Sequence, residues 1–284
     1  MKFIILILLP FFANAQLVYK GRIIHNRNKA NVPFATIGLM KENVGINADE
    51  LGQFDLPSKG IPGDTLIISC VGFETFKMPS NIFTQGMTLG IEEKATSMKP
   101  VILKNKFKVS KELNGYANCG IGDFYTSGGY ITQVAQKYHS SVQNSLLSKI
   151  GICKEGGNSL FRVRVYDVDT LTGKPSTDLA DTIIEVNSSK KNVQVDLEKL
   201  RIFIPNNDFF IAIEWIYIPY NERSGKSKTN GKEIIIKSYT PYVFFNRNGG
   251  SDLEVESWGL NYQGIWTEFF GRKTRLLISA VVKY

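Results

Sequence analysis

Histidine and cysteine are scarce: the 284 residues include only His25, His139 and three cysteines. The patterns G-x-S-x-G and H-E-x-x-H and the glycine-rich phosphate loop do not occur. No two cysteines have the C-x-x-C spacing of zinc or redox sites. We therefore expect a non-catalytic protein that needs no cofactor. The alternative is a hydrolase with an unrecognised site, in which Cys119 or Cys153 is the nucleophile and His139 its base.

Long apolar runs are also lacking. After residue 15, no stretch reaches the ~18 apolar residues that a membrane-spanning helix needs. At the start, Lys2 precedes the apolar run FIILILLPFF at 3–12 and the small residues Ala13-Asn14-Ala15. This order is typical of a secretory signal peptide. We expect residues 1–15 to be removed and the mature chain, which begins at Gln16, to be exported without a transmembrane helix.

Patterns for long helices are almost missing. Short runs rich in Val, Ile, Phe, Tyr and Thr alternate with Gly, Asn, Asp and Pro, which predicts strands nearly throughout. One segment, 131–147, has apolar residues at helical spacing, namely Val134, Tyr138, Val142 and Leu146. It is a candidate short helix, with a strand as the alternative. The fold class expected for the chain is all-β.

The first block, residues 16–103, contains about seven short predicted strands, which indicates a small β-sandwich. Within it, segments 44–48 and 52–56 are expected to form a hairpin around Asp49-Glu50-Leu51-Gly52. Gly52 can adopt a positive φ in that turn at low cost.

Four motifs in this block follow one another in a recognisable order and spacing. They are GRII at 21–24, VPFATI at 32–37, GINADELGQF at 45–54 and DTLIISCVGF at 64–73. They resemble the G-x-V strand, P-x-x-x-A-x-V strand, T-D-x-x-G-x-F hairpin and L-x-I-S-x-x-G-Y corner of the carboxypeptidase regulatory-like domain family. The resemblance implies a transthyretin-like (prealbumin-like) sandwich that is not itself catalytic. Similar domains precede outer-membrane nutrient receptors, so it also implies a bacterial cell envelope, either the periplasm or the outer-membrane surface.

A short basic linker is expected at 104–111, followed by a second domain at 112–284. In the second block, the segment 160–168 alternates cleanly: Phe161, Val163 and Val165 fall on one face, and Arg162, Arg164 and Tyr166 on the other. Turn signals at 172–175, 206–208, 230–231 and 248–250 separate further predicted strands. This spacing favours a second antiparallel β-sandwich, jelly-roll-like, of unknown function.

The net charge of +8 is spread over the chain except for two lysine clusters. One cluster lies in the expected linker, and the other, Lys226, Lys228 and Lys232, lies in an expected polar loop. Positive charge favours acidic glycans or lipid headgroups, but a solvated surface is the preferred interpretation. No nucleic-acid partner is expected for an exported protein.

Aromatic residues give the leading candidate binding site. Trp258, Tyr262 and Trp266 lie within nine residues, and Tyr217 and Tyr220 lie close together at another strand end. Exposed rings beside amide groups form stacking platforms for sugars or hydrophobic partners. The even separation of the two tryptophans puts them on one side of a single extended strand. The alternative is that these rings belong to the core.

Two further features stay open at the level of sequence. Four carboxylates around one turn form a weak calcium candidate, with a solvated loop as the alternative; they are Asp167, Asp169, Asp178 and Asp181. A Cys119–Cys153 disulfide is compatible with an oxidising compartment, but sequence spacing does not establish it. The odd number of cysteines leaves at least one without a partner in the chain.

These observations predict a binding or scaffolding protein of the bacterial cell envelope. It would engage a protein partner or a glycan through loop and aromatic surfaces of the second domain. The alternatives are the hydrolase above and a purely structural envelope module. The ligand, the number of subunits and the face of the outer membrane are not specified by the sequence.

Overall fold

The computed structural model describes residues 17–94, 107–116, 118–119, 123–127, 131–155, 157–229, 232–246, 257–269 and 274–284. These residues form strands joined by turns and by three short 3₁₀ segments, Ser80–Ile82, Glu198–Leu200 and Pro219–Asn221. The all-β prediction is confirmed. Within these ranges no helix has the length and apolar character to cross a membrane. The predicted signal peptide, at 1–15, lies outside the described residues.

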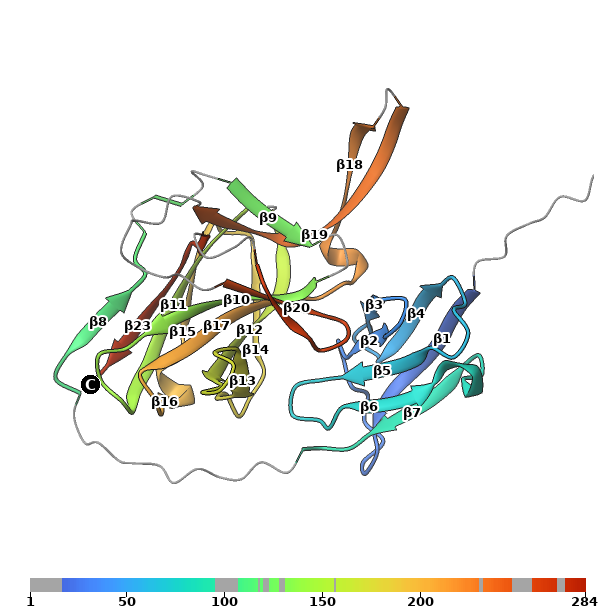
Figure 1. Ribbon diagram of the computed structural model, residues 1–284, viewed down its shortest axis with the longest axis horizontal. Helices are drawn as coiled ribbons and strands as arrows, with labels where there is room; N and C mark the ends of the chain where they lie inside the picture. The colour runs from blue at the N-terminus through green and yellow to red at the C-terminus, as the bar shows by residue number, and fades with distance from the viewer. Residues whose placement is uncertain are drawn as a thin grey trace, which may run out of the picture.

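The N-terminal sandwich consists of two small sheets (Figure 1). The first has the strand order β4-β1-β7 and the second the order β3-β2-β5-β6. Strands β1 and β7 pair in parallel, whereas the other pairs are antiparallel. The bounds are β1 (Leu17–His25), β2 (Thr36–Leu39), β3 (Val44–Asn47), β4 (Gln53–Ser58), β5 (Thr65–Ser69), β6 (Phe76–Pro79) and β7 (Met87–Ile91).

Alternating side chains build the core of this sandwich. In β4, Phe54 and Leu56 are buried while Asp55 between them is exposed, as expected for a strand with one face toward a core. Ile23 of β1 and Ile37 of β2 are fully buried against them. The small sandwich that the sequence predicts is therefore confirmed.

The hairpin expected from segments 44–48 and 52–56 is wrong. Strand β3 pairs with β2, and β4 pairs with β1 in the other sheet. The intervening turn forms as predicted: the Asp49 carboxylate accepts 2.8 Å hydrogen bonds from the N–H groups of Leu51 and Gln53. Gly52 has φ +75°. The turn thus carries the chain from one sheet to the other, because local residues specify a turn and not the partner of the strand that follows.

The described strands between Ser110 and Lys283 form two larger sheets. The seven-stranded sheet has the order β13-β12-β17-β10-β20-β21, with β14 also on β12. The nine-stranded sheet has the order β18-β19-β11-β23-β8, with β15 and β16 also on β11 and with β9 and β22 also on β19. The bounds are β8 (Ser110–Leu113), β9 (Asp123–Ser127), β10 (Ile131–His139), β11 (Ser145–Glu155), β12 (Ser159–Val168), β13 (Pro175–Asp178), β14 (Ile184–Ser188), β15 (Asn192–Asp196), β16 (Ile202–Ile204), β17 (Asp208–Trp215), β18 (Glu222–Thr229), β19 (Lys232–Asn246), β20 (Ser257–Asn261), β21 (Trp266–Glu268), β22 (Arg275–Leu276) and β23 (Ile278–Lys283).

The core of the C-terminal sandwich lies between these sheets. Ile211 and Ile213 of β17 extend from the seven-stranded sheet, and Ile150 and Ile152 of β11 extend from the nine-stranded sheet. All four side chains are fully buried in one apolar cluster. The second antiparallel sandwich predicted from the sequence is therefore confirmed.

The candidate helix at 131–147 is wrong. Its first part is strand β10, which pairs with β17 on one side and β20 on the other. The residues from Thr132 to Gln136 are all buried, so both faces of this strand are covered. A strand covered on both faces loses its alternation of apolar and polar residues, and chance spacing then resembles a helix.

The polar loop expected around Lys226, Lys228 and Lys232 is also wrong. These residues lie in β18 and the first part of β19, which pair from Glu222–Tyr239 to Thr229–Lys232. This hairpin projects from the body of the molecule (Figure 1). We call residues 222–229 and 232–239 the arm.

Candidate functional site

The outer face of the seven-stranded sheet carries polar and aromatic side chains. On β12, Val163 and Val165 point into the core, so Arg164 and Tyr166 lie on the opposite face. The sequence alternation predicted this pair of faces correctly.

Neighbouring strands extend the same face. The register runs from Arg164 to Ala212, from Ala212 to Ala135, and from Ala135 to Trp258 across β12, β17, β10 and β20. The two alanines leave space above the sheet, which the ring of Trp258 helps to fill. Trp266 of β21 packs against this group. The side chains that form what we call the outer-face cluster are Gln133, Arg164, Tyr166, Asp178, Glu214, Trp258 and Trp266.

A polar network fixes the centre of the outer-face cluster. The Arg164 guanidinium donates from Nε to Asp178 Oδ2 at 2.8 Å and from Nη1 to Glu214 Oε2 at 2.9 Å. The Tyr166 hydroxyl donates to Gln133 Oε1 at 2.8 Å. The side chains of Arg164, Asp178 and Glu214 are 15%, 20% and 7% exposed. Charge-assisted bonds of this kind hold the groups in one orientation before any ligand arrives.

The protonation states of this network are set by burial and by neighbouring charge. Burial strongly raises the pKa of Tyr166, so its phenol stays neutral and remains a donor at neutral pH. For Arg164, burial opposes the charged form, but the neighbouring carboxylates of Glu214 and Asp178 favour it, and the net shift of the pKa is upward. The guanidinium therefore stays charged whenever the protein is folded.

Ring contacts surround the network. The rings of Tyr166 and Trp266 meet edge to face, with centroids 5.6 Å apart. Arg164 Cζ lies 5.5 Å from the Tyr166 ring centroid, and Lys174 Nζ lies 5.6 Å from the Trp258 ring centroid. The indole N–H of Trp258 is buried and has no hydrogen-bond partner among the described residues. Such an unpaired donor costs free energy unless a ligand or water satisfies it.

The two tryptophans share a face, although not in the way the sequence predicts. They lie on β20 and β21, adjacent strands of one hairpin in which Leu260 pairs with Trp266. The prediction that both tryptophans lie on a single extended strand is therefore wrong. Trp258 is 8% exposed and Trp266 is half-buried. The alternative of core packing describes Trp258 better than an open platform does.

The three candidate tyrosines lie apart from this cluster. Tyr217 and Tyr262 are buried and contact the N-terminal sandwich. Tyr220 is 46% exposed at the 3₁₀ turn Pro219–Asn221. The core alternative describes Tyr217 and Tyr262 better than an exposed platform does, because both are buried in the apolar cluster of the C-terminal sandwich.

The two sandwiches contact each other through specific hydrogen bonds and ring packing. Tyr217 N–H donates to Asn47 Oδ1 at 2.8 Å, and the amide of Gln263 donates to the Met40 carbonyl at 2.7 Å. The Tyr262 ring lies so close to Gly45 that a Cβ there would overlap it. In Figure 1 the turn after β20 lies beside β2 and β3. Sequence reasoning missed this contact, since its two sides are far apart in the chain.

Arg162 anchors the same contact. Its side chain is 1% exposed and donates to the carbonyls of Phe34 and Pro33 at 3.2 and 3.3 Å. Phe34 adopts φ +56°, an unusual backbone conformation for a bulky residue. Arg162 and Arg164 are two residues apart on β12, so their side chains lie on the same face of the strand. The N-terminal sandwich, which contacts Arg162, therefore lies next to the outer-face cluster.

The four calcium candidates serve other roles or stay at the surface. Asp178 binds Arg164, and Asp169 accepts 2.9 Å hydrogen bonds from the N–H groups of Leu171 and Thr172. Asp167 accepts from its neighbour Val168 N–H at 2.9 Å. Asp181 is exposed. In the described part of the chain, no three His, Cys, Asp or Glu side chains are grouped to hold a metal ion. The hydrogen bonds of Asp167 and Asp169 match the turn-stabilising alternative.

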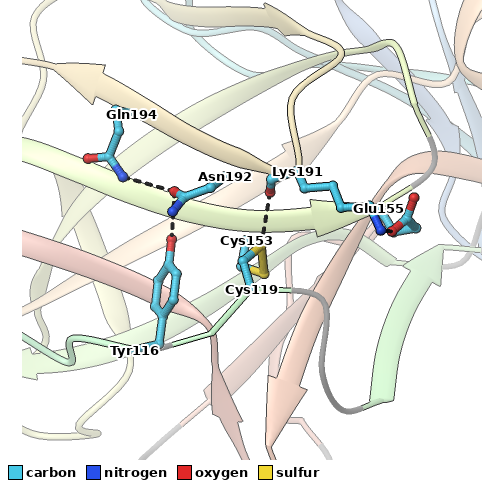
Figure 2. Close-up of a disulfide and its surroundings, with 7 residues drawn as sticks. All are labelled: Tyr116, Cys119, Cys153, Glu155, Lys191, Asn192 and Gln194. Atoms are coloured by element: carbon cyan, nitrogen blue, oxygen red, sulfur yellow. Dashed lines mark hydrogen bonds and ion pairs between the residues drawn. A yellow bond between two sulfur atoms is a disulfide. The ribbon is translucent and has the colours of Figure 1, made fainter.

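The proposed Cys–His nucleophile is wrong. Cys119 and Cys153 form a disulfide with their Cα atoms 5.3 Å apart, so neither is a free thiol (Figure 2). His139 instead places Nδ1 2.6 Å from Asp208 Oδ1 and is 71% exposed. Cys70 is the free cysteine.

Gln133 and Glu214 are the members of the outer-face cluster that sequence reasoning missed. Both sit on strands buried on both faces, where a polar residue interrupts an apolar run. That interruption is the available signal, because buried polar side chains need partners. The partner on β12 follows only from the strand register.

No curated protein matches the chain. A solved structure of the cysteine protease and lectin-like domains of Cwp84 from Clostridium difficile is 13% identical, with a TM-score of 0.38, over 84% of this chain and 48% of that one. Another, of Cwp84 after propeptide cleavage, is 13% identical, with a TM-score of 0.40, over 84% and 57%. A proposed carbohydrate-binding protein from Bacteroides uniformis is 9% identical, with a TM-score of 0.19, over 80% and 96%. This chain thus spans about half the length of the Cwp84 chains, and TM-scores of this size do not establish a shared fold.

The sequence motifs of the N-terminal block have a direct counterpart among known families. The model of the CarboxypepD_reg-like domain family matches residues 19–103. This segment covers strands β1 to β7 of the N-terminal sandwich, apart from the first two residues of β1. Residues 19–103 of this chain are therefore a CarboxypepD_reg-like domain.

Proposed function

We propose that this chain is a non-catalytic binding protein of the bacterial cell envelope, and that the outer-face cluster binds a neutral glycan. The observation that carries the proposal is the outer-face cluster itself. It combines aromatic rings with hydrogen-bonding groups that the fold has already oriented. Sugar recognition needs both elements, because a sugar ring has apolar faces and a rim of hydroxyl groups.

The preference for a neutral glycan follows from the charges. The positive charge of Arg164 is compensated by its ion pairs with Asp178 and Glu214, so it does not attract an anionic ligand. Lys174 lies over the Trp258 ring. Amide, carboxylate and guanidinium groups that satisfy one another can still accept and donate bonds to hydroxyl groups.

The envelope location rests on two supports. Residues 1–15 have the order of a signal peptide, which predicts export. The Cys119–Cys153 disulfide is of the kind that persists in oxidising compartments. A cell fractionation with a protease-shaving control tests this part separately.

A binding role fits the cluster better than the hydrolase alternative. The two carboxylates of the cluster, Asp178 and Glu214, both bind the guanidinium of Arg164. A catalytic carboxylate must reach the reacting group of a substrate, whereas Asp178 Oδ2 and Glu214 Oε2 each accept a hydrogen bond from this guanidinium. The arrangement therefore supports positioning of a ligand rather than proton transfer.

The test is a glycan array probed with the labelled mature chain, followed by calorimetric titration of the best ligand. We expect Trp266→Ala to weaken binding at least about tenfold, because the half-buried Trp266 ring is the most accessible ring of the cluster. Tyr220→Ala is the matched control, since Tyr220 is an exposed ring outside the cluster. Its affinity should equal that of the unmodified chain.

Two results would reject this function. One is the absence of any glycan that binds the folded chain. The other is binding that survives Trp266→Ala but is lost on Tyr220→Ala, which would place the ligand at the other aromatic position.

A further inference from the structure

The arm exposes three consecutive isoleucines. Ile234, Ile235 and Ile236 are 41%, 73% and 47% exposed. Neighbouring residues of a strand point to opposite sides, so Ile235 lies on one face of the arm and the other two lie on its second face. Contiguous exposed apolar side chains on a projecting element mark an interaction surface.

The strand register shows how each face is composed. Ile235 is directly opposite Lys226, so that face is mixed apolar and cationic. On the second face, Ile236 is opposite Gly225 and Ile234 is opposite Ser227. Small partners leave the two isoleucines uncovered, and the second face is thereby open to a side chain from outside.

The arm also offers free strand edges. Among the described residues, β18 pairs only with β19, and the part of β19 from 232 to 238 pairs only with β18. Each such edge presents backbone N–H and C=O groups that an additional strand can use. A ribbon of two strands is at most marginally stable in water, and a third strand would support it.

The net charge of the arm indicates that its partner is acidic. The described arm carries five basic residues against Glu222 and Glu233, a net charge of +3. The two glutamates pair with Lys237 and Lys226 at 2.9 and 3.4 Å. Lys228 and Lys232 make no ion pair among the described residues, so they remain available to an acidic partner.

We propose that the arm binds an acidic, extended protein segment, which adds to it as a further β-strand. Backbone pairing would supply the affinity and the lysines would select acidic side chains. An anionic membrane is the less favoured occupant. The sequence from Thr229 to Lys232, TNGK, is polar, whereas a membrane-inserting segment would have apolar residues at these positions.

The experiment titrates the whole mature chain against a fluorescent peptide of alternating valine and glutamate, with anisotropy as the readout. Lys228→Glu/Lys232→Glu should weaken binding at least about tenfold. The matched control is Lys190→Glu/Lys199→Glu, the same charge change at exposed positions outside the arm, which should change affinity less than about twofold. Melting curves should show all variants folded.

Two comparisons separate strand addition from simple charge attraction and from membrane binding. The same peptide with alternate backbone nitrogens methylated should bind at least about tenfold more weakly, because it cannot pair with a strand edge. Equal binding of the methylated peptide, or no binding of the first peptide, overturns the proposal. Sedimentation with phosphatidylglycerol vesicles that depends on Lys228 and Lys232, without peptide binding, also overturns it and makes the arm a membrane contact. None of these variants touches the outer-face cluster, so failure here leaves the glycan proposal standing.

Discussion

The ionisation of Cys70, in the N-terminal sandwich, is affected by charged residues of the C-terminal sandwich. It follows β5 and packs against the core of the N-terminal sandwich. Burial raises the pKa of the Cys70 thiol; the charge of Arg162 lowers it and that of Glu214 raises it, both from across the contact. The net shift is upward, which keeps the thiol protonated and unreactive at neutral pH.

We therefore expect Cys70 to react slowly with iodoacetamide. At pH 8 the raised pKa leaves less thiolate in the folded chain, so alkylation should be at least about fivefold slower than in urea. The difference should narrow as the pH rises, because both states then ionise. Mass spectrometry should find one modified cysteine before reduction and three after reduction and unfolding. Equally fast modification of the folded chain would contradict this environment for Cys70.

At the scale of single elements, the sequence predicts strands well where one face is exposed. The segment 160–168 alternates and forms β12 as expected. The segment 131–139 does not alternate, because β10 is covered on both faces, and the spacing of apolar residues over 131–147 then resembles that of a helix. Alternation of apolar and polar residues arises when the two faces of a strand differ in exposure. A strand that is buried on both faces lacks this pattern and is therefore not recognised from the sequence.

Pairing between elements is the part that the sequence does not predict. The turn at Asp49–Gly52 forms as expected, yet it joins strands of two different sheets. The same limit applies to the outer-face cluster. The alternation of β12 predicts the shared face of Arg164 and Tyr166, but only the register brings Trp258 within the same group.

At the scale of the whole molecule, the two sandwiches form one docked unit. The anchoring contact is Arg162, whose charge is buried against backbone carbonyls of the N-terminal sandwich. Two carboxylates also lie nearby, Glu185 at 3.7 Å and Glu214 at 3.9 Å. Removing a buried cation leaves these acceptors unsatisfied, which costs more than the loss of a surface charge.

Arg162→Ala should therefore lower the free energy of unfolding by about 3 kcal/mol. Urea denaturation followed by tryptophan fluorescence measures the change. Arg27→Ala is the matched control, because Arg27 is exposed in the turn that follows β1 and the loss of its side chain should cost less than about 0.5 kcal/mol. Equal effects of the two substitutions would show that the docking contact does not depend on Arg162.

The central claim is that a glycan binds the outer-face cluster, and the chain provides a direct reporter of it. It has three tryptophans, so an NMR spectrum of the indole N–H groups should contain three signals. Trp258 and Trp266 belong to the cluster, whereas the Trp215 indole donates to the Pro241 carbonyl at 2.8 Å within the core. Trp215 thus serves as an internal control.

The decisive measurement is a titration of the ¹⁵N-labelled mature chain with the best ligand from the glycan array. The account predicts that the Trp258 and Trp266 indole signals shift in proportion to saturation while the Trp215 signal stays in place. Movement of Trp258 is the most informative, because its N–H has no partner among the described residues. Saturable binding that leaves the Trp258 and Trp266 signals unmoved would contradict the account and place the glycan elsewhere on the molecule.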